Sequence, residues 1–230
     1  MFVPSALAVD PNPSYQDKGD FYLTYKPTDY FQGFEDWVKE AKYFEGEIQF
    51  LNETFKLPYD VEIVIADSSY DHNCEYPNAF YYAVEKEIVI CYEYISHTHW
   101  KFKDYFDSVH GDNWPPYVDL NYSTINVIDS TFYHEMGHAL VDIYELPITG
   151  PEESVADQFG AYMVLEFLEQ EIAQDTMMDT AIDFWLAAEK NPDLTESAFA
   201  DTHGLNQQRF YDLACWAYGS DPDYHQYMWS

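Results

Sequence analysis

The chain has 230 residues, which is enough for one substantial hydrophobic core and a single domain. Hydrophobic residues make up 47% of it and aromatic residues 19%, so the chain is not intrinsically disordered. The 42 acidic and 10 basic residues give a formal net charge of −32. Because such a surface repels nucleic acid phosphates and anionic membranes, we expect neither as a partner. The same charge costs stability through self-repulsion, which salt relieves.

The location of the protein is indicated by three features. No run of about 18 apolar residues occurs, so no membrane-spanning helix is predicted. The small-residue run Ala6-Leu7-Ala8 is similar to the end of a signal peptide. Cys74 and Cys91 flank two expected strands, and their spacing favours a disulfide, although small buried thiols are the alternative. Cys215 is then unpaired, and we expect an extracellular or periplasmic protein.

The first part of the chain predicts one helix and three strands. Residues 1–28 are rich in Pro, Asp and Tyr without a clear period, so we expect an extended N-terminal segment. Apolar residues recur every three or four positions in residues 29–55, which predicts an amphipathic helix. Strands are expected at residues 61–65, 79–83 and 87–91, with a short polar connection between the last two.

Helices dominate the rest of the chain. They are expected at about residues 92–109, 124–146, 151–173, 176–189 and 206–218. Pro147 and Gly150 end the second of these helices. Because strands precede residue 95 and helices follow it, the pattern predicts an α+β fold with segregated elements.

A metal-binding motif lies on the helix expected at residues 124–146. Residues four apart share one face of a helix, so His134 and His138 of His-Glu-Met-Gly-His can bind one Zn²⁺ through ring nitrogens. Glu135 lies beside the metal, where it can take a proton from water and pass it to a leaving amine. Gly137 costs about 1 kcal/mol relative to Ala, which indicates close approach of another backbone or of substrate. Two surface histidines on an ordinary helix are the alternative.

A catalytic zinc needs a third protein ligand and one open position. Glu153 and Asp157 lie four residues apart on the next expected helix. Glu153 can ligate the metal while Asp157 accepts the second ring N–H of a ligand histidine, which fixes its tautomer and orientation. Glu152 is an alternative ligand, and an acidic first turn that complements the helix dipole is the alternative without a metal. We therefore predict one Zn²⁺ per chain, held by His134, His138 and Glu153.

These residues resemble a known family. HEMGH followed by Glu153-Ser-Val-Ala-Asp157 is similar to the signature of gluzincins, the thermolysin-like clan of zinc metallopeptidases. Residues 50–222, about three quarters of the chain, resemble an uncharacterised bacterial metallopeptidase family. The matching segments are FLNETFKLPYDVEIVIAD, EYPNAFYYAVEKEIVICYEYI, FYHEMGHALVDIYELPITGPEESVADQFG and DTHGLNQQRFYDLACWAYGSDP. The resemblance implies a zincin-like fold, in which a small mixed sheet packs on the active helix and the C-terminal half is mostly helical.

The resemblance implies two further sites. Asn78 and Ala79 match an edge-strand segment that binds substrate main chain, since an edge strand has free N–H and C=O groups. An ordinary hairpin is the alternative. His203 matches a downstream histidine that stabilises the oxyanion and is oriented by an aspartate, here Asp201. A helix-entry loop capped by Asp201 or Thr202 is the alternative.

Together the motifs and the resemblance predict a zinc-dependent peptidase that acts on a peptide or protein. The absence of a signature that captures a free amino end makes an endopeptidase the default. A catalytically silent zinc-binding module that holds a peptide or protein partner is the alternative. We expect one metallopeptidase domain at residues 29–230, with an upper lobe at about 29–146 and a lower lobe at about 147–230. The spacer from His138 to Glu153 is shorter than in thermolysin itself, which points to a minimal version.

Overall fold

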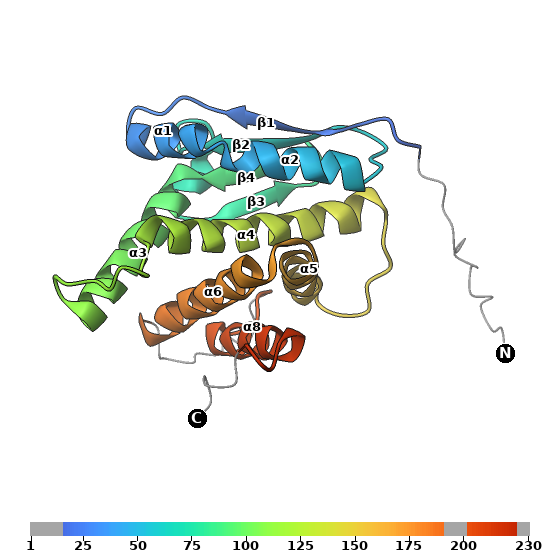
Figure 1. The fold of residues 1–230 in the computed structure, drawn as a ribbon. Helices are drawn as coiled ribbons and strands as arrows, with labels where there is room; N and C mark the ends of the chain where they lie inside the picture. Colours follow the sequence, from blue (N-terminus) through green and yellow to red (C-terminus); the bar gives the residue numbers. More distant parts are fainter. Residues whose placement is uncertain (1–15, 191–201, 225–230) are drawn as a thin grey trace.

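The computed structural model describes residues 16–190 and 202–224. Within these residues, one four-stranded sheet and seven α-helices form the predicted α+β fold, which is mostly helical (Figure 1). The strands are β1 (Phe21–Tyr25), β2 (Val61–Ala66), β3 (Ala79–Tyr82) and β4 (Glu87–Cys91). The helices are α1 (Gln32–Ala41), α2 (Tyr43–Thr54), α3 (Tyr92–His110), α4 (Leu120–Ile143), α5 (Glu152–Phe167), α6 (Gln170–Lys190) and α8 (Asn206–Ser220), and one 3₁₀ turn is η1 (His72–Glu75).

The sheet is mixed, and its strands follow the order β1-β2-β4-β3. β1, β2 and β4 run parallel, while β3 runs antiparallel to β4 with Ala79 opposite Ile90. In the part of the chain that the structure describes, β3 is therefore an edge strand. In Figure 1 the sheet lies on one side of α4, while α5, α6 and α8 lie on the other. α4 thus separates a β-containing layer from a helical one.

Strand β1 adds to the prediction for residues 1–28. We expected an extended entry segment, and within it residues 21–25 pair with β2 from Phe21 opposite Val61 onward. The outer side of β1 is also held, because the amide of Asn52 bonds the main-chain N–H and C=O of Phe21 at 2.7 and 2.9 Å. These partners lie far along the chain, so a five-residue pattern could not reveal them. Residues 1–15, which include the signal-peptide-like run, lie outside the described residues.

Two predicted helices are each interrupted. The helix expected at residues 29–55 divides into α1 and α2 at Lys42, whose φ of 50° is in the left-handed region. The helix expected at 151–173 ends at Phe167, because Leu168 is extended, and α6 starts at Gln170. Neither break is marked by Gly or Pro, so hydrophobic periodicity continued across both.

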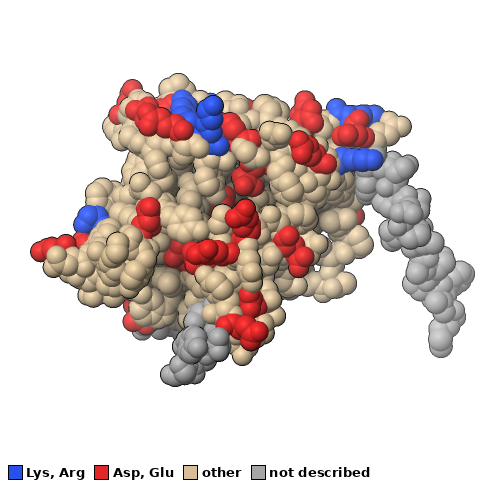
Figure 2. Space-filling view, viewed as in Figure 1, with Lys and Arg blue, Asp and Glu red and all other residues tan. Residues whose placement is uncertain are grey.

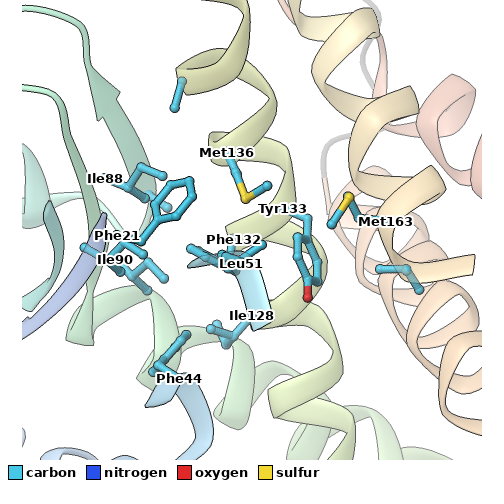
Figure 3. Packing of buried hydrophobic residues seen from close by; sticks show 14 of the residues in the cluster. Phe21, Phe44, Leu51, Ile88, Ile90, Ile128, Phe132, Tyr133, Met136 and Met163 are labelled. Carbon is cyan, nitrogen blue, oxygen red and sulfur yellow. The ribbon is translucent and has the colours of Figure 1, made fainter. Parts of the chain in front are cut away.

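The main core lies between the sheet, α2, α4 and α5. Figure 3 shows apolar side chains that meet between the sheet, α2 and α4: Phe21, Phe44, Leu51, Ile88, Ile90, Ile128, Phe132 and Met136. Met163 of α5 packs on the other side of α4. α4 is buried on nearly every side, as expected of a helix between two layers. Its buried polar groups accordingly need partners, and two hydrogen bonds link it to α2, from Tyr43 to Asp129 and from Tyr133 to Glu47. Burial raises the pKa of both carboxyl groups.

The predicted disulfide is present. It joins Cys74 of η1 to Cys91 at the end of β4 and so fastens η1 against the sheet. Cys215 is a free, exposed thiol. Among the described helices, none combines the length and the apolar composition that a bilayer crossing requires.

Acidic side chains are spread over the face of the molecule shown in Figure 2 rather than gathered in one patch. They form several groups across this face, while Lys and Arg occupy only a few places near its edges. This distribution is consistent with the net charge of −32.

Candidate metal centre

Helices α4 and α5 bring three metal-ligand side chains together. His134 and His138 lie one turn apart on α4, and their Nε2 atoms are 3.3 Å apart. Glu153, in the first turn of α5, places Oε2 at 3.2 Å from Nε2 of His134 and at 3.5 Å from Nε2 of His138. Within the described residues, this is the only group of three His, Cys, Asp or Glu side chains that could hold one ion.

The close approach of α5 to α4 depends on two glycines. A Cβ atom on Gly137 would lie only 2.9 Å from Cα of Ala156 in α5. A Cβ atom on Gly160 of α5 would lie 3.3 Å from the main-chain N of His134. The sequence left open whether Gly137 faces a backbone or a substrate, and the structure shows that it faces the backbone of α5. This contact brings Glu153 within reach of the histidines.

Each histidine of the pair has a carboxylate at its other ring nitrogen. Nδ1 of His134 lies 2.8 Å from Oδ1 of Asp157, as the sequence predicted. Nδ1 of His138 lies 2.8 Å from Oε1 of Glu152, so Glu152 is a partner of the ring rather than a member of the ligand group. A ring that donates from Nδ1 keeps a lone pair on Nε2 for a metal. Both Nε2 atoms point toward Glu153.

Arg209 of α8 fixes the carboxylate of Asp157. Its Nε and Nη2 atoms lie 2.9 and 2.5 Å from the two oxygens of Asp157, in a bidentate pair. Its guanidinium also lies over the ring of Phe184, with Cζ 4.0 Å from the ring centroid. A continuous series of contacts therefore runs from Arg209 through Asp157 to His134. Arg209 is the only arginine of the chain, and this rarity was the only sequence feature that could have drawn attention to it. The sequence did not show which side chain Arg209 contacts.

The electrostatic environment favours a positive charge between the carboxylates. Although burial alone lowers the pKa of His134, its contacts with Asp157 and Glu153 raise it to about 9. The rings of His134, His138 and His203 hold the pKa of Glu153 far below its usual value. Oε2 of Glu153 is buried, and the three imidazole nitrogens within 3.5 Å of it are not aligned to form a regular hydrogen bond with it. A metal ion would replace the proton that the ring otherwise keeps.

A cleft of about 940 Å³ runs beside the three side chains. α4 lines it with Glu135, His134 and His138, and the edge strand β3 lines it together with Asn78. The start of α5 and His203 complete the lining. Glu135 is 8% exposed, and burial raises the pKa of its carboxyl group.

The two sites implied by the resemblance both border this cleft. Asn78 and Ala79 line it where β3 begins, and β3 is an edge strand as expected. Nε2 of His203 lies 3.0 Å from Oε2 of Glu153, so this histidine reaches the metal centre from the loop before α8. Asp201, which we expected to orient His203, lies outside the described residues.

Comparison with known proteins identifies the family. A family model described as "Putative metallopeptidase" (DUF4344) matches residues 25–230. The chain belongs to this metallopeptidase family. No curated protein and no solved structure matched the chain. Membership suggests a hydrolase that cleaves peptide bonds, and the group formed by His134, His138 and Glu153 suggests where its metal binds.

The sequence predicted the residues of the motif and the contact of Asp157 with His134, but it did not predict the other supporting contacts. The bond from Glu152 to His138 and the bidentate pair of Arg209 with Asp157 were not predicted. The assignment of His134, His138 and Glu153 as ligands, and of Glu135 and His203 as catalytic residues, stays a prediction.

Proposed function

We propose that the chain is a zinc-dependent endopeptidase of the thermolysin-like clan, with a zincin-like arrangement of sheet and active helix. One observation carries the proposal: the facing atoms of His134, His138 and Glu153 lie 3.2, 3.3 and 3.5 Å apart. A tetrahedral Zn²⁺ with ligands at about 2.0–2.1 Å requires its ligand atoms to be roughly 3.3 Å apart. Three protein ligands of this kind also leave a fourth position open, which suits a catalytic rather than a structural ion.

The residues around the ion have distinct roles in the proposed reaction. Zinc, when bound, supplies a Lewis acid that polarises the peptide carbonyl and acidifies water. Glu135 takes a proton from the attacking water on its carboxylate and passes it to the leaving nitrogen. His203 donates a hydrogen bond to the oxygen that becomes negative. β3 binds the main chain of an extended peptide along its free edge.

The proposed substrate is a peptide or protein outside the cell or in the periplasm. The disulfide between Cys74 and Cys91 favours an oxidising compartment. A net charge of −32 disfavours nucleic acids and anionic membranes as partners.

Zinc content tests the proposed centre. We expect about one zinc per chain in the protein purified with excess metal, and a sharp loss in Glu153→Ala. Glu152→Ala is the matched control, because this neighbour contacts His138 only at Nδ1, and it should keep its zinc. A wild-type protein without zinc contradicts the proposal, and zinc retained in Glu153→Ala contradicts the ligand assignment.

Turnover is tested separately with Glu135→Gln. A mixture of proteome-derived peptides, analysed by mass spectrometry, needs no knowledge of the substrate. We expect the wild type to cleave internal peptide bonds, and Glu135→Gln to keep its zinc but lose cleavage by several orders of magnitude. A wild-type protein that holds one zinc and cleaves nothing would support the silent zinc-binding module instead.

A further inference from the structure

A second, smaller cavity of about 170 Å³ opens beside the metal centre. His134 and Glu135 line both this cavity and the cleft, so a substrate in the cleft can direct one side chain into it. Its far walls come from α3, α6 and α8, and it is too small to hold more than a single side chain. Its lining therefore bears on which residue is accepted next to the scissile bond.

A buried ion pair stands at the wall formed by α6. Nζ of Lys101 lies 2.6 Å from Oδ1 of Asp183, and the two side chains are 8% and 10% exposed. Asp183 lines the cavity, whereas Lys101 lies behind Asp183 and does not line the cavity. Among the described residues, no hydrogen bond engages Oδ2 of Asp183, which leaves this oxygen as an acceptor.

Stabilisation of the fold does not by itself explain why this buried ion pair is present. Desolvation of two buried charges can cost as much as their attraction returns, and apolar residues of similar size are often equally stable. The pair also uses one of only 10 basic residues in the chain. A carboxylate held in place at a cavity wall is what recognition of a donor group requires.

Hydroxyl oxygens of the lining can accept a hydrogen bond as well, although the side chain of Arg209 and one hydroxyl of the Tyr94–Thr131 pair are donors. The hydroxyl groups of Tyr94 and Thr131 lie 2.8 Å apart and bond each other. Thr180 donates its hydroxyl hydrogen to the main-chain oxygen of Thr176 at 2.7 Å, so its oxygen can only accept a further bond. Both Tyr94 and Thr180 line the cavity. Burial raises the pKa of Tyr94, which keeps its hydroxyl protonated.

The charged side chains that α6 and α8 contribute to the lining are each part of an ion pair. Lys101 neutralises Asp183, and Arg209, which also lines the cavity, neutralises Asp157. A cationic guest would meet the guanidinium of Arg209, and an anionic guest would meet Asp183 and Glu135. A neutral guest that donates hydrogen bonds meets neither penalty.

We propose that Asp183 is a specificity-determining residue that selects a neutral, hydrogen-bond-donating side chain, such as that of Asn, Gln, Ser or Thr, beside the scissile bond. This inference rests on the proposed peptidase function and names its substrate class. A site built to bond a polar group rejects an analogue that lacks the group, because the buried acceptors of the site are then left unpaired.

Binding of matched probes tests the proposal without relying on turnover. The probes are peptide hydroxamates that differ in one side chain, which is carboxamidomethyl, isobutyl, carboxymethyl or aminobutyl. The first three are similar in size and differ in chemistry. With zinc-loaded wild type, calorimetry should give at least about tenfold tighter binding for the carboxamide than for each of the others.

A double variant tests whether the buried pair causes this preference. Lys101→Met with Asp183→Leu removes both charges, whereas loss of Asp183 alone would leave a buried unpaired lysine. We expect the double variant to keep its zinc and to bind the isobutyl probe at least as tightly as the carboxamide. The control is Lys103→Met with Asp107→Leu, an exposed pair on the same helix at 2.6 Å, and it should retain the wild-type preference.

The outcomes separate this proposal from the one on which it rests. A zinc-loaded wild type that binds the isobutyl, carboxymethyl or aminobutyl probe most tightly overturns the role of Asp183 and leaves the peptidase proposal intact. A preference unchanged in the double variant overturns the role of the pair in the same way. A wild type that takes up no zinc overturns both proposals.

Discussion

The two histidines of the metal centre share one helix but are supported very differently. On one side, His134 contacts Asp157, whose side chain is 20% exposed and is held by a bidentate pair with Arg209. On the other side, His138 contacts Glu152, whose side chain is 50% exposed. Among the described residues, no further side chain holds Glu152.

The difference follows from where the helices pack. α5 packs against the His134 side of α4 and α8 packs against α5, so a charged pair there is shielded from water and its geometry is fixed. The His138 side opens into the cleft, where an exposed contact is worth little. His134 is therefore held in place from the lower helices, while His138 stays adjacent to the cleft.

Loss of Asp157 should give the largest effect. Removing the group that orients a ligand histidine typically weakens metal binding about 10–100-fold. We expect Asp157→Ala to fall in this range and Glu152→Ala to stay within about threefold of wild type. Competition with a chromogenic zinc chelator measures both. Equal effects of the two substitutions would contradict the proposed difference between the histidines.

Gly137→Ala tests the helix contact on which both sides depend. The added methyl group would overlap the backbone of Ala156, so α5 must shift, and overpacking of this kind costs about 1–3 kcal/mol. Gly46→Ala is the control, since Gly46 lies in α2 with nothing within 4 Å of the added atom, and it should stabilise by up to about 1 kcal/mol. Urea unfolding of the metal-free proteins measures both changes. Stabilisation by Gly137→Ala would show that α5 does not need this contact.

Arg209→Met should weaken zinc binding by up to about tenfold, because Asp157 keeps its charge but loses its bidentate partner. We expect Arg209 to affect metal binding only through its contact with Asp157. The substitution should therefore add almost nothing to Asp157→Ala in a double variant, although each single variant weakens binding. Additive effects of the two substitutions would indicate a separate role for Arg209.

Asp142 should show the smallest effect, and the size of this effect depends on pH. It ties β3 and β4 to α4, since Tyr81 and Lys86 donate to Oδ2 at 2.6 and 2.5 Å. Partial burial alone would raise the pKa of Asp142, but the bonds from Lys86 and Tyr81 hold it below its ordinary 3.8. The stabilisation is thus present above about pH 4 and is lost as pH falls through the lower folded value.

We expect Asp142→Asn to lower the free energy of unfolding at pH 7 by a few tenths to about 1 kcal/mol, because the pair is partly exposed to solvent. The difference from wild type should shrink as pH falls below about 4. Urea unfolding at several pH values measures it. A difference that stays constant with pH would mean that the charge of Asp142 does not contribute.

Short-range sequence patterns were sufficient to predict several features of this protein. The helical period places His134 and His138 on one face, and the same spacing relates Glu153 to Asp157 on the next helix. Strands β2, β3 and β4 were predicted from runs of β-branched and aromatic residues, and the disulfide from the cysteines that flank them. These features depend on neighbours within a few residues or on one short loop.

Other features were decided only by tertiary packing. β1 is a strand because β2 and Asn52 satisfy its backbone, and α2 starts at Tyr43, after Lys42, without any helix-breaking residue. Arg209 reaches Asp157 across 52 positions of the chain, and Lys101 reaches Asp183 across 82. Such contacts depend on which helices lie together, and composition and periodicity carry no information about that. The residues that would bind the metal and the contact of Asp157 with His134 were therefore predictable from the sequence, whereas the contacts of Arg209 and Glu152 and the cavity beside them were not.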